Sequence, residues 1–195
     1  MSAHRNIPFY LHSLGPEDGR KMLDVLATPF LTSGAVSRAV EEQLCCFFNA
    51  PHALLVNSFT NGAIAALLAL GMGPGDEVIV PASTFIASAN VVELVGAKTV
   101  FADVDPDTLC LDIESVKAAL SERTKAIMLV HLYGAYFDVR PFAQLARAKS
   151  IYLIEDCAHC FEGSFDGIHP GQLSDVAIFS FYAPTNITCG DGGAI

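Results

Sequence analysis

The sequence predicts an α/β fold with three layers, in which a mostly parallel β-sheet is covered by helices on both faces. From residue 53 onward, short apolar runs rich in valine and isoleucine alternate with segments of helix length, the pattern of parallel strands joined by crossover helices. Hydrophobic residues make up 52% of the 195 residues, and charged residues only 16%. Such a composition suits a sheet buried on both faces and a chain that hides further surface in an oligomer.

Residues 1–34 contain several prolines and glycines, and we expect them to form an arm with one short helix at 17–26. Residues 35–195 are assigned to one large domain, which begins with a helix at 35–48. The predicted strands are 53–56, 77–80, 99–102, 126–130, 151–154 and 176–180. The predicted helices between them are 61–70, 85–95, 112–120 and 139–148. Gly71 and Gly96 are expected to end helices and Asp112 to cap one, and a last strand begins near Gly192.

Charge and hydropathy exclude several classes of partner. The formal net charge of −10, with no cluster of lysines and arginines, argues against nucleic acid, because phosphate neutralisation needs a basic patch. The longest apolar runs, such as 63–70, are too short to span a bilayer, so no membrane association is expected. Residues 1–8 lack the basic-then-apolar pattern of a secretion signal. We therefore expect a cytoplasmic protein whose six cysteines are free thiols.

The segment Cys157-Ala-His-Cys160 has the spacing of a metal-binding or redox motif. A structural zinc site would need a second pair of ligands at similar spacing. The sequence offers no such pair, and we predict no metal site.

In parallel sheets of this kind, ligands bind at the carboxyl ends of the strands. The turn at 57–62 follows the first strand and opens a helix, where free backbone N–H groups and the helix dipole can hold a phosphate. An ordinary N-cap formed by Thr60 or Asn61 is the alternative. Neither a GK[ST] phosphate loop nor a GxGxxG dinucleotide motif is present.

Three other strand ends carry residues that suit a planar, charged cofactor. Phe85 follows the second strand and can lie flat against a ring, or it can be a core aromatic residue. Glu155 and Asp156 follow the fifth strand, where a buried carboxylate needs a partner such as a protonated ring nitrogen, an N-cap or a salt bridge. His159 lies within reach of the same ligand, and Ser180 adds a hydroxyl after the sixth strand. A phosphate cradle, a flat ring, an acid and a hydroxyl are the components of a pyridoxal 5′-phosphate (PLP) site.

With these features the chain resembles the DegT/DnrJ/StrS family of PLP-dependent sugar aminotransferases, which have the aspartate-aminotransferase fold. The segments that carry the resemblance are LGMGPGDEVIVP (70–81), TFIASAN (84–90), DVDPDT (103–108), TKAI (124–127), VHLYG (130–134) and EDCAH (155–159). The resemblance implies the large domain of a PLP transferase. It also implies that the last strand belongs in the middle of the sheet, between the first and sixth runs.

The resemblance implies roles around the phosphate and the ring face. Thr60 and Asn61 correspond to the backbone cradle of the PLP phosphate, and Ser180 to its side-chain partner. Phe85 corresponds to the residue that stacks on the pyridine ring. Members of the family usually work as dimers and transfer an amino group, often from glutamate, to a keto group of a nucleotide-linked sugar.

Two further positions correspond to groups at the ring edge, and one is a departure from the family. Asp156 corresponds to the acid that keeps the pyridine nitrogen protonated, and His159 to a residue near the phenolic oxygen. The family motif Ser-Phe-Tyr, one small residue, Thr-Lys-Asn is replaced here by SFYAPTN (180–186). Thr185 therefore stands at the position of the Schiff-base lysine, and Pro184 at that of the preceding threonine.

The chain is also shorter than the family implies. We expect the large domain to be incomplete at its carboxyl end and the carboxyl-terminal small domain to be absent. The first hypothesis is an aminotransferase fragment or decayed copy, inactive alone, that binds PLP noncovalently at best. The second is a non-catalytic PLP-binding or regulatory protein that forms a homodimer or pairs with a full-length paralogue. A sugar dehydratase with histidine in place of the lysine is disfavoured by Thr185, and a Rossmann oxidoreductase by the missing fingerprint.

Overall fold

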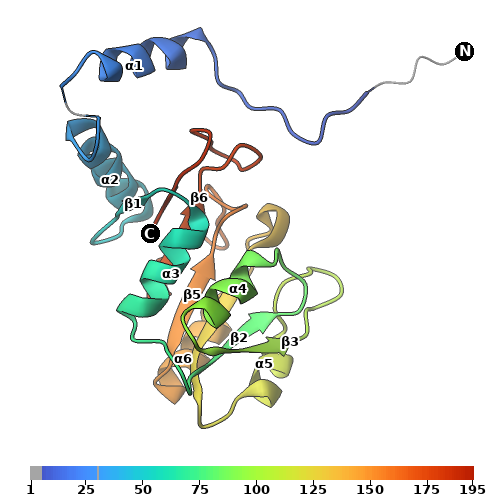
Figure 1. Cartoon of the computed structure of the whole chain (residues 1–195). Coiled ribbons are helices and arrows are strands. Elements are labelled where there is room, and N and C mark those ends of the chain that lie inside the picture. Colours follow the sequence, from blue (N-terminus) through green and yellow to red (C-terminus); the bar gives the residue numbers. More distant parts are fainter. Residues whose placement is uncertain (1–5, 30) are drawn as a thin grey trace, which may run out of the picture.

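The computed structural model describes residues 6–29 and 31–195 and confirms the three-layer α/β fold (Figure 1). One seven-stranded sheet has the order β1-β7-β6-β5-β4-β2-β3. The strands are β1 (Leu55–Val56), β2 (Glu77–Pro81), β3 (Lys98–Ala102), β4 (Thr124–Val130), β5 (Tyr152–Asp156), β6 (Val176–Ser180) and β7 (Gly193–Ala194). The helices are α1 (Pro16–Leu26), α2 (Ala35–Phe48), α3 (Phe59–Ala69), α4 (Ala87–Leu94), α5 (Ile113–Ala119), the 3₁₀ helix η1 (Leu132–Gly134) and α6 (Arg140–Lys149).

The two faces of the sheet are buried by different helices, and the pleat of each strand separates their residues. On one face, Val78 and Val80 of β2 belong to the cluster that also contains the apolar residues of α3 and α4. On the other face, Ile79 packs in the cluster formed with α5 and α6. Neighbouring strands from β3 to β6 pair in parallel, as the alternation of runs and helices predicts.

The helices are short, and most of the predicted stop signals are confirmed. Gly71 and Gly96 have φ angles of 73° and 83°, the left-handed region that glycine occupies without strain. The Asp112 carboxylate caps α5 by accepting a hydrogen bond of 2.7 Å from Ser115 N. The longest described helix, α2, has 14 residues, and none in residues 6–29 and 31–195 is both long and apolar enough to cross a membrane.

The last strand, β7, has the two neighbours that were expected, but it does not lie in the middle of the sheet. β7 pairs antiparallel with β1 and with β6, as predicted. The expectation that it lies in the middle of the sheet is wrong, because β1 is an edge strand with a neighbour on one side only. The longer strands β6, β5 and β4 form the centre instead.

The two amino-terminal helices differ in how they are covered. α2 packs on the sheet through Leu44 and Phe48, which contact the cluster around Phe179 and Phe181. α1 has no buried residue and lies apart from the three-layer body (Figure 1). The predicted arm at 1–34 includes residues 1–5 and 30, which lie outside the described residues.

We predict that Gly193→Ala destabilises the domain by about 1–3 kcal/mol, the usual range for overpacking. A β-carbon on Gly193 would lie 2.5 Å from the Phe179 carbonyl oxygen and 3.1 Å from Phe59 N, so β6 or the start of α3 would have to shift. Urea unfolding measures the loss. Gly73→Ala is the matched control, because a β-carbon there meets nothing within 4 Å; equal effects of the two substitutions would contradict this packing.

Candidate active site

A small cavity lies where the ends of β4 and β5 meet the starts of α3 and α4. Its volume is about 40 Å³, room for little more than one water molecule. The residues that line it are Phe59, Thr84, Phe85, Val130, His131, Leu132, Asp156, Ala158 and His159. The structure thus brings Phe85, Asp156 and His159 together as predicted. Thr60 and Asn61 follow Phe59 directly in α3, and Ser180 ends β6 beside β5.

Asp156 is a buried carboxylate that takes part in none of the ion pairs among the described residues. Only 4% of the residue is exposed. Its Oδ2 accepts a hydrogen bond of 2.7 Å from Ser88 Oγ, and its Oδ1 accepts one of 3.0 Å from Ala158 N. Burial raises the pKa of Asp156 above its usual value, and these two hydrogen bonds and the electrostatic effects of His159 and His131 oppose that shift. Ser88 and Thr84, whose hydroxyl oxygens are 2.9 Å apart, form the chain of hydroxyls that reaches the acid.

Phe85 and His159 present two rings at the rim of the cavity. Phe85 is 68% exposed, so it is not the core residue that the alternative interpretation required. His159 Nδ1 accepts a hydrogen bond of 3.3 Å from Tyr133 N, which in the neutral ring leaves the proton on Nε2. The rings of His159 and Tyr133 are nearly parallel, with centroids 6.0 Å apart.

The start of α3 is capped by a residue that the sequence analysis did not single out. Ser58 is the N-cap, and its Oγ accepts a hydrogen bond of 3.2 Å from Asn61 N. The alternative of a cap by Thr60 or Asn61 is therefore wrong. The N–H groups of Phe59 and Thr60 lie in the first turn, where a helix offers them no internal acceptor.

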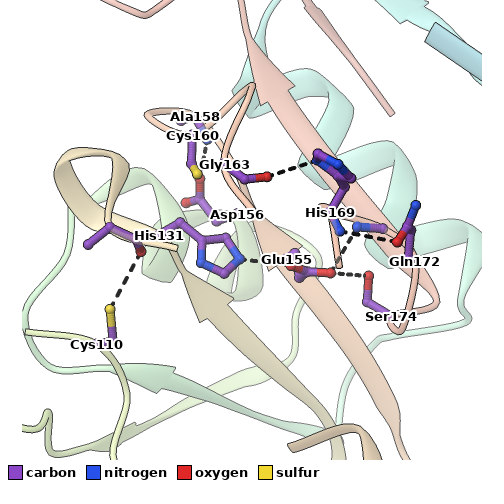
Figure 2. A network of polar contacts seen from close by, with 12 residues as sticks. Cys110, His131, Glu155, Asp156, Ala158, Cys160, Gly163, His169, Gln172 and Ser174 are labelled. Carbon is purple, nitrogen blue, oxygen red and sulfur yellow. Dashed lines mark hydrogen bonds and ion pairs between the residues drawn. The ribbon is translucent and has the colours of Figure 1, made fainter. Parts of the chain in front are cut away.

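The other carboxylate of β5 serves a different face of the sheet. Glu155 is fully buried, and its Oε2 lies 2.8 Å from His131 Nε2 (Figure 2). Its Oε1 accepts hydrogen bonds from Gly171 N at 3.0 Å and Ser174 Oγ at 2.7 Å. The strand pleat sends Glu155 away from Asp156, so only one of the two acids reaches the cavity. Neither His131 nor Ser88 was given a role from the sequence, because their partners are distant in the chain.

The two cysteines of the CxxC segment are buried thiols. Burial raises the pKa of Cys160 to about 11 and that of Cys157 well above its usual value, so neither is a thiolate at neutral pH. Among the described residues, one group of three metal-ligating atoms lies within 4.8 Å of one another, on His131, Glu155 and Cys157. Both oxygens of Glu155 already have hydrogen-bond partners in the protein, which suits a structural role in the buried core.

Thr185 lies in the loop between β6 and β7, and its hydroxyl is turned toward the backbone of that loop. It contacts the carbonyl oxygens of Ser180, Tyr182 and Ile187. No lysine is among the residues that line the cavity. Lys98, Lys117 and Lys125 pair with acidic side chains at other places in the described part of the chain.

Residues 12–195 match the DegT/DnrJ/EryC1/StrS aminotransferase family, and the chain belongs to this family. Spr1654 of Streptococcus pneumoniae, a protein assigned as a sugar aminotransferase, superposes with a TM-score of 0.94 at 31% identity in its PLP form. The superposition covers 97% of this chain and 52% of Spr1654; a PMP form of Spr1654 is also known.

Two other aminotransferase structures are similarly close. TlmJ, an aminotransferase of Streptoalloteichus hindustanus, gives a TM-score of 0.93 at 33% identity, covering 97% of this chain and 52% of TlmJ. DesV of S. venezuelae gives 0.88 at 36% identity, covering 91% of this chain and 48% of DesV. The chain thus spans about half the length of these structures and shares the fold of that half.

We predict that Asp156→Asn stabilises the chain at pH 8 by about 1–3 kcal/mol, because it removes an incompletely compensated buried charge. The pKa of Asp156 is raised in the folded state, so the wild-type carboxyl binds its proton more tightly when folded. The protonated carboxyl therefore stabilises the folded state at low pH. This stabilisation is lost as pH rises from about 4, the pKa of the carboxyl in the unfolded chain, through its raised pKa in the folded chain.

Urea unfolding of both proteins at pH 4 and pH 8 measures this difference. The advantage of Asp156→Asn should be small at pH 4 and full at pH 8. An advantage that is the same at both pH values would show that the Asp156 carboxylate is compensated by the protein itself.

Proposed function

We propose that this chain is the cofactor-binding part of a PLP-dependent sugar aminotransferase and that it does not catalyse transamination by itself. The observation that carries the proposal is the buried Asp156 carboxylate, which lines a cavity together with the exposed Phe85 and takes part in no ion pair in the described part of the chain. The family and its PLP-bound relative support the choice of cofactor.

The residues around the cavity fit the pyridine ring of PLP. A protonated ring nitrogen would give Asp156 the cation that its burial demands. The cavity itself is too small to enclose a ring, and the exposed side chain of Phe85 would hold the ring by stacking. The Nε2 N–H of His159 is suited to donate a hydrogen bond to the phenolic oxygen.

The phosphate site is supported by the first turn of α3 and by Ser180. The N–H groups of Phe59 and Thr60 and the positive end of the helix dipole favour an anion there. Asn61 N already donates to Ser58 Oγ, so a phosphate that uses Asn61 must displace the Ser58 hydroxyl or share its place. We assign Ser180 as the side-chain partner, because it stands at the same edge of the sheet on the strand next to β5.

Bound PLP would supply an electron sink, and the protein must supply an amine that binds it and moves protons. Thr185 supplies neither function. A hydroxyl cannot form an imine, and its pKa is far too high for a base at neutral pH. Pro184 adds a second obstacle, because it fixes φ and removes an N–H in the loop that presents residue 185. Any PLP bound by this chain is therefore held noncovalently.

The substrate and the partners follow from the family. We assign a nucleotide-linked keto sugar as the amino acceptor of the intact enzyme and glutamate as the amino donor, and we place the protein in the cytoplasm. A second function, a non-catalytic protein that forms a homodimer or pairs with a full-length paralogue, is favoured by α1. Its apolar side chains Met22, Leu23 and Leu26 are 66%, 65% and 61% exposed, as expected of a helix that a partner covers.

We predict that PLP binds to the chain but that borohydride does not fix it at residue 185. Binding is measured by the change in PLP absorbance on titration, and Asp156→Asn should weaken it at least tenfold through loss of the charge pair. An adduct found by mass spectrometry must sit on Lys21, Lys98, Lys117, Lys125 or Lys149, or on the amino-terminal amine. A lysine adduct located in the cavity that Phe85, Asp156 and His159 line would contradict the assigned site.

We predict no transamination by the 195-residue chain, because Thr185 supplies no amine that could bind the cofactor and move protons. The assay couples glutamate consumption to a panel of nucleotide-linked keto sugars. Thr185→Lys alone should stay inactive, whereas Thr185→Lys with Pro184→Thr, grafted onto the carboxyl half of a family member, should turn over. Turnover by the unmodified chain would contradict an inactive site, and a silent graft would contradict the roles given to Asp156 and Ser180.

A further inference from the structure

Two hydroxyl groups connect the wall of the cavity to the buried carboxylate of Asp156. Thr84 lines the cavity, and its Oγ1 lies 2.9 Å from Ser88 Oγ. Ser88 is fully buried, and its Oγ donates a hydrogen bond of 2.7 Å to Asp156 Oδ2. Because Ser88 stands in the first turn of α4, the carboxylate that it contacts also lies beside the positive end of that helix.

The hydrogen bonds of this chain have one direction when Asp156 is charged. A serine hydroxyl has a single proton, and a charged carboxylate accepts it more strongly than a neutral carbonyl does. The Ser88 proton therefore goes to Asp156 rather than to the Phe85 carbonyl oxygen, which is 3.2 Å from Ser88 Oγ. Thr84 must then be the donor in its contact with Ser88, and its donation strengthens the bond from Ser88 to the acid.

Donors from two different elements fix the orientation of the Asp156 carboxylate. Its Oδ2 accepts from Ser88 of α4, and its Oδ1 accepts from Ala158 N, which follows β5. The terminal torsion of an aspartate side chain is otherwise broad, so hydrogen bonds to both oxygens define the plane of the carboxylate. An ionised carboxylate has about four lone-pair sites, and those that Ser88 and Ala158 leave free can serve a ligand in the cavity.

We infer that Ser88 is a positioning residue for the proposed cofactor: its hydroxyl, supported by that of Thr84, holds Asp156 charged and in one orientation for the ring nitrogen of PLP. The inference rests on the proposed function of this site. Burial raises the pKa of Asp156, and the hydrogen bond from Ser88 is the largest effect that opposes the rise. Without Ser88 the acid would be held more in its protonated form, which offers a ring nitrogen no negative charge.

The first test uses urea unfolding of the chain without cofactor. Ser88→Ala should raise the unfolding equilibrium constant about tenfold at pH 8, the scale of a hydrogen bond to a charged group. The effect should be much smaller at pH 4, because loss of the hydroxyl raises the pKa of Asp156 in the folded chain further and stability then falls more steeply as pH rises. His131, His159 and Cys157 also interact electrostatically with Asp156. An Asp156→Asn chain keeps these three groups, and in it Ser88→Ala should have the same effect at both pH values.

The second test adds PLP labelled with nitrogen-15 in its ring. Ser88→Ala should raise the dissociation constant of PLP about tenfold, and the ring nitrogen resonance should move toward that of the neutral ring. Ser88→Thr keeps the hydroxyl and should keep the wild-type resonance. Ser121→Ala is the matched control, because the Ser121 hydroxyl donates to another buried carboxylate, that of Glu77 at the opposite end of the sheet. It should leave the dissociation constant and the resonance unchanged.

The outcomes separate this inference from the function on which it rests. If Ser88→Ala lowers stability equally at pH 4 and pH 8, or leaves the ring nitrogen resonance of bound PLP unchanged, Ser88 has a packing role only and the inference is overturned. A wild-type chain that does not bind PLP would overturn the proposed function itself, and the inference with it.

Discussion

Two adjacent carboxylates at the carboxyl end of a buried parallel strand, β5 (Tyr152–Asp156), are the constraint around which this domain is organised. Side chains alternate along β5, so Glu155 and Asp156 enter opposite layers of the protein, and each needs its own compensation. The carboxylate oxygens of Glu155 have hydrogen-bond partners inside the protein, which are His131 and Ser174. Asp156 receives hydrogen bonds from Ser88 and from one N–H, but none of the ion pairs among the described residues includes it. The cofactor site that we propose therefore lies on the side of the sheet that α3 and α4 cover.

Most of the fold was predictable because it depends on signals that are local in the chain. Apolar runs separated by glycines at Gly71 and Gly96 place the strands and helix ends correctly, and Asp112 marks a helix start. Boundaries shifted where local signals compete. α3 begins at Phe59 because Ser58, the earlier of several hydroxyl and amide residues, takes the cap. The position of β7 relative to its neighbours came only from the family resemblance, since two residues carry no pattern of their own.

The site was predictable in part, for a related reason. Residues that follow strands could be assigned to one edge of the sheet, and Phe85, Asp156 and His159 do line one cavity. The contacts that tune them come from residues far away in sequence, which no spacing rule reaches. Ser88 lies 68 positions from the acid it contacts, and it sits within an ordinary helical stretch. Such pairings are products of the tertiary fold, and they require coordinates to be seen.

Helix α1 has a consequence for how the chain behaves before it meets any partner. It has 11 residues and none of them is buried, whereas isolated helices shorter than about 12–15 residues are marginal in water. Its amide protons should therefore exchange with solvent far faster than those of the sheet, and the chain should be cut first by proteases near this helix. When a partner protein binds the apolar side of α1, the binding energy must also offset the conformational entropy that the helix loses on becoming ordered. Association at α1 will therefore be weaker than the exposed apolar area of the helix suggests.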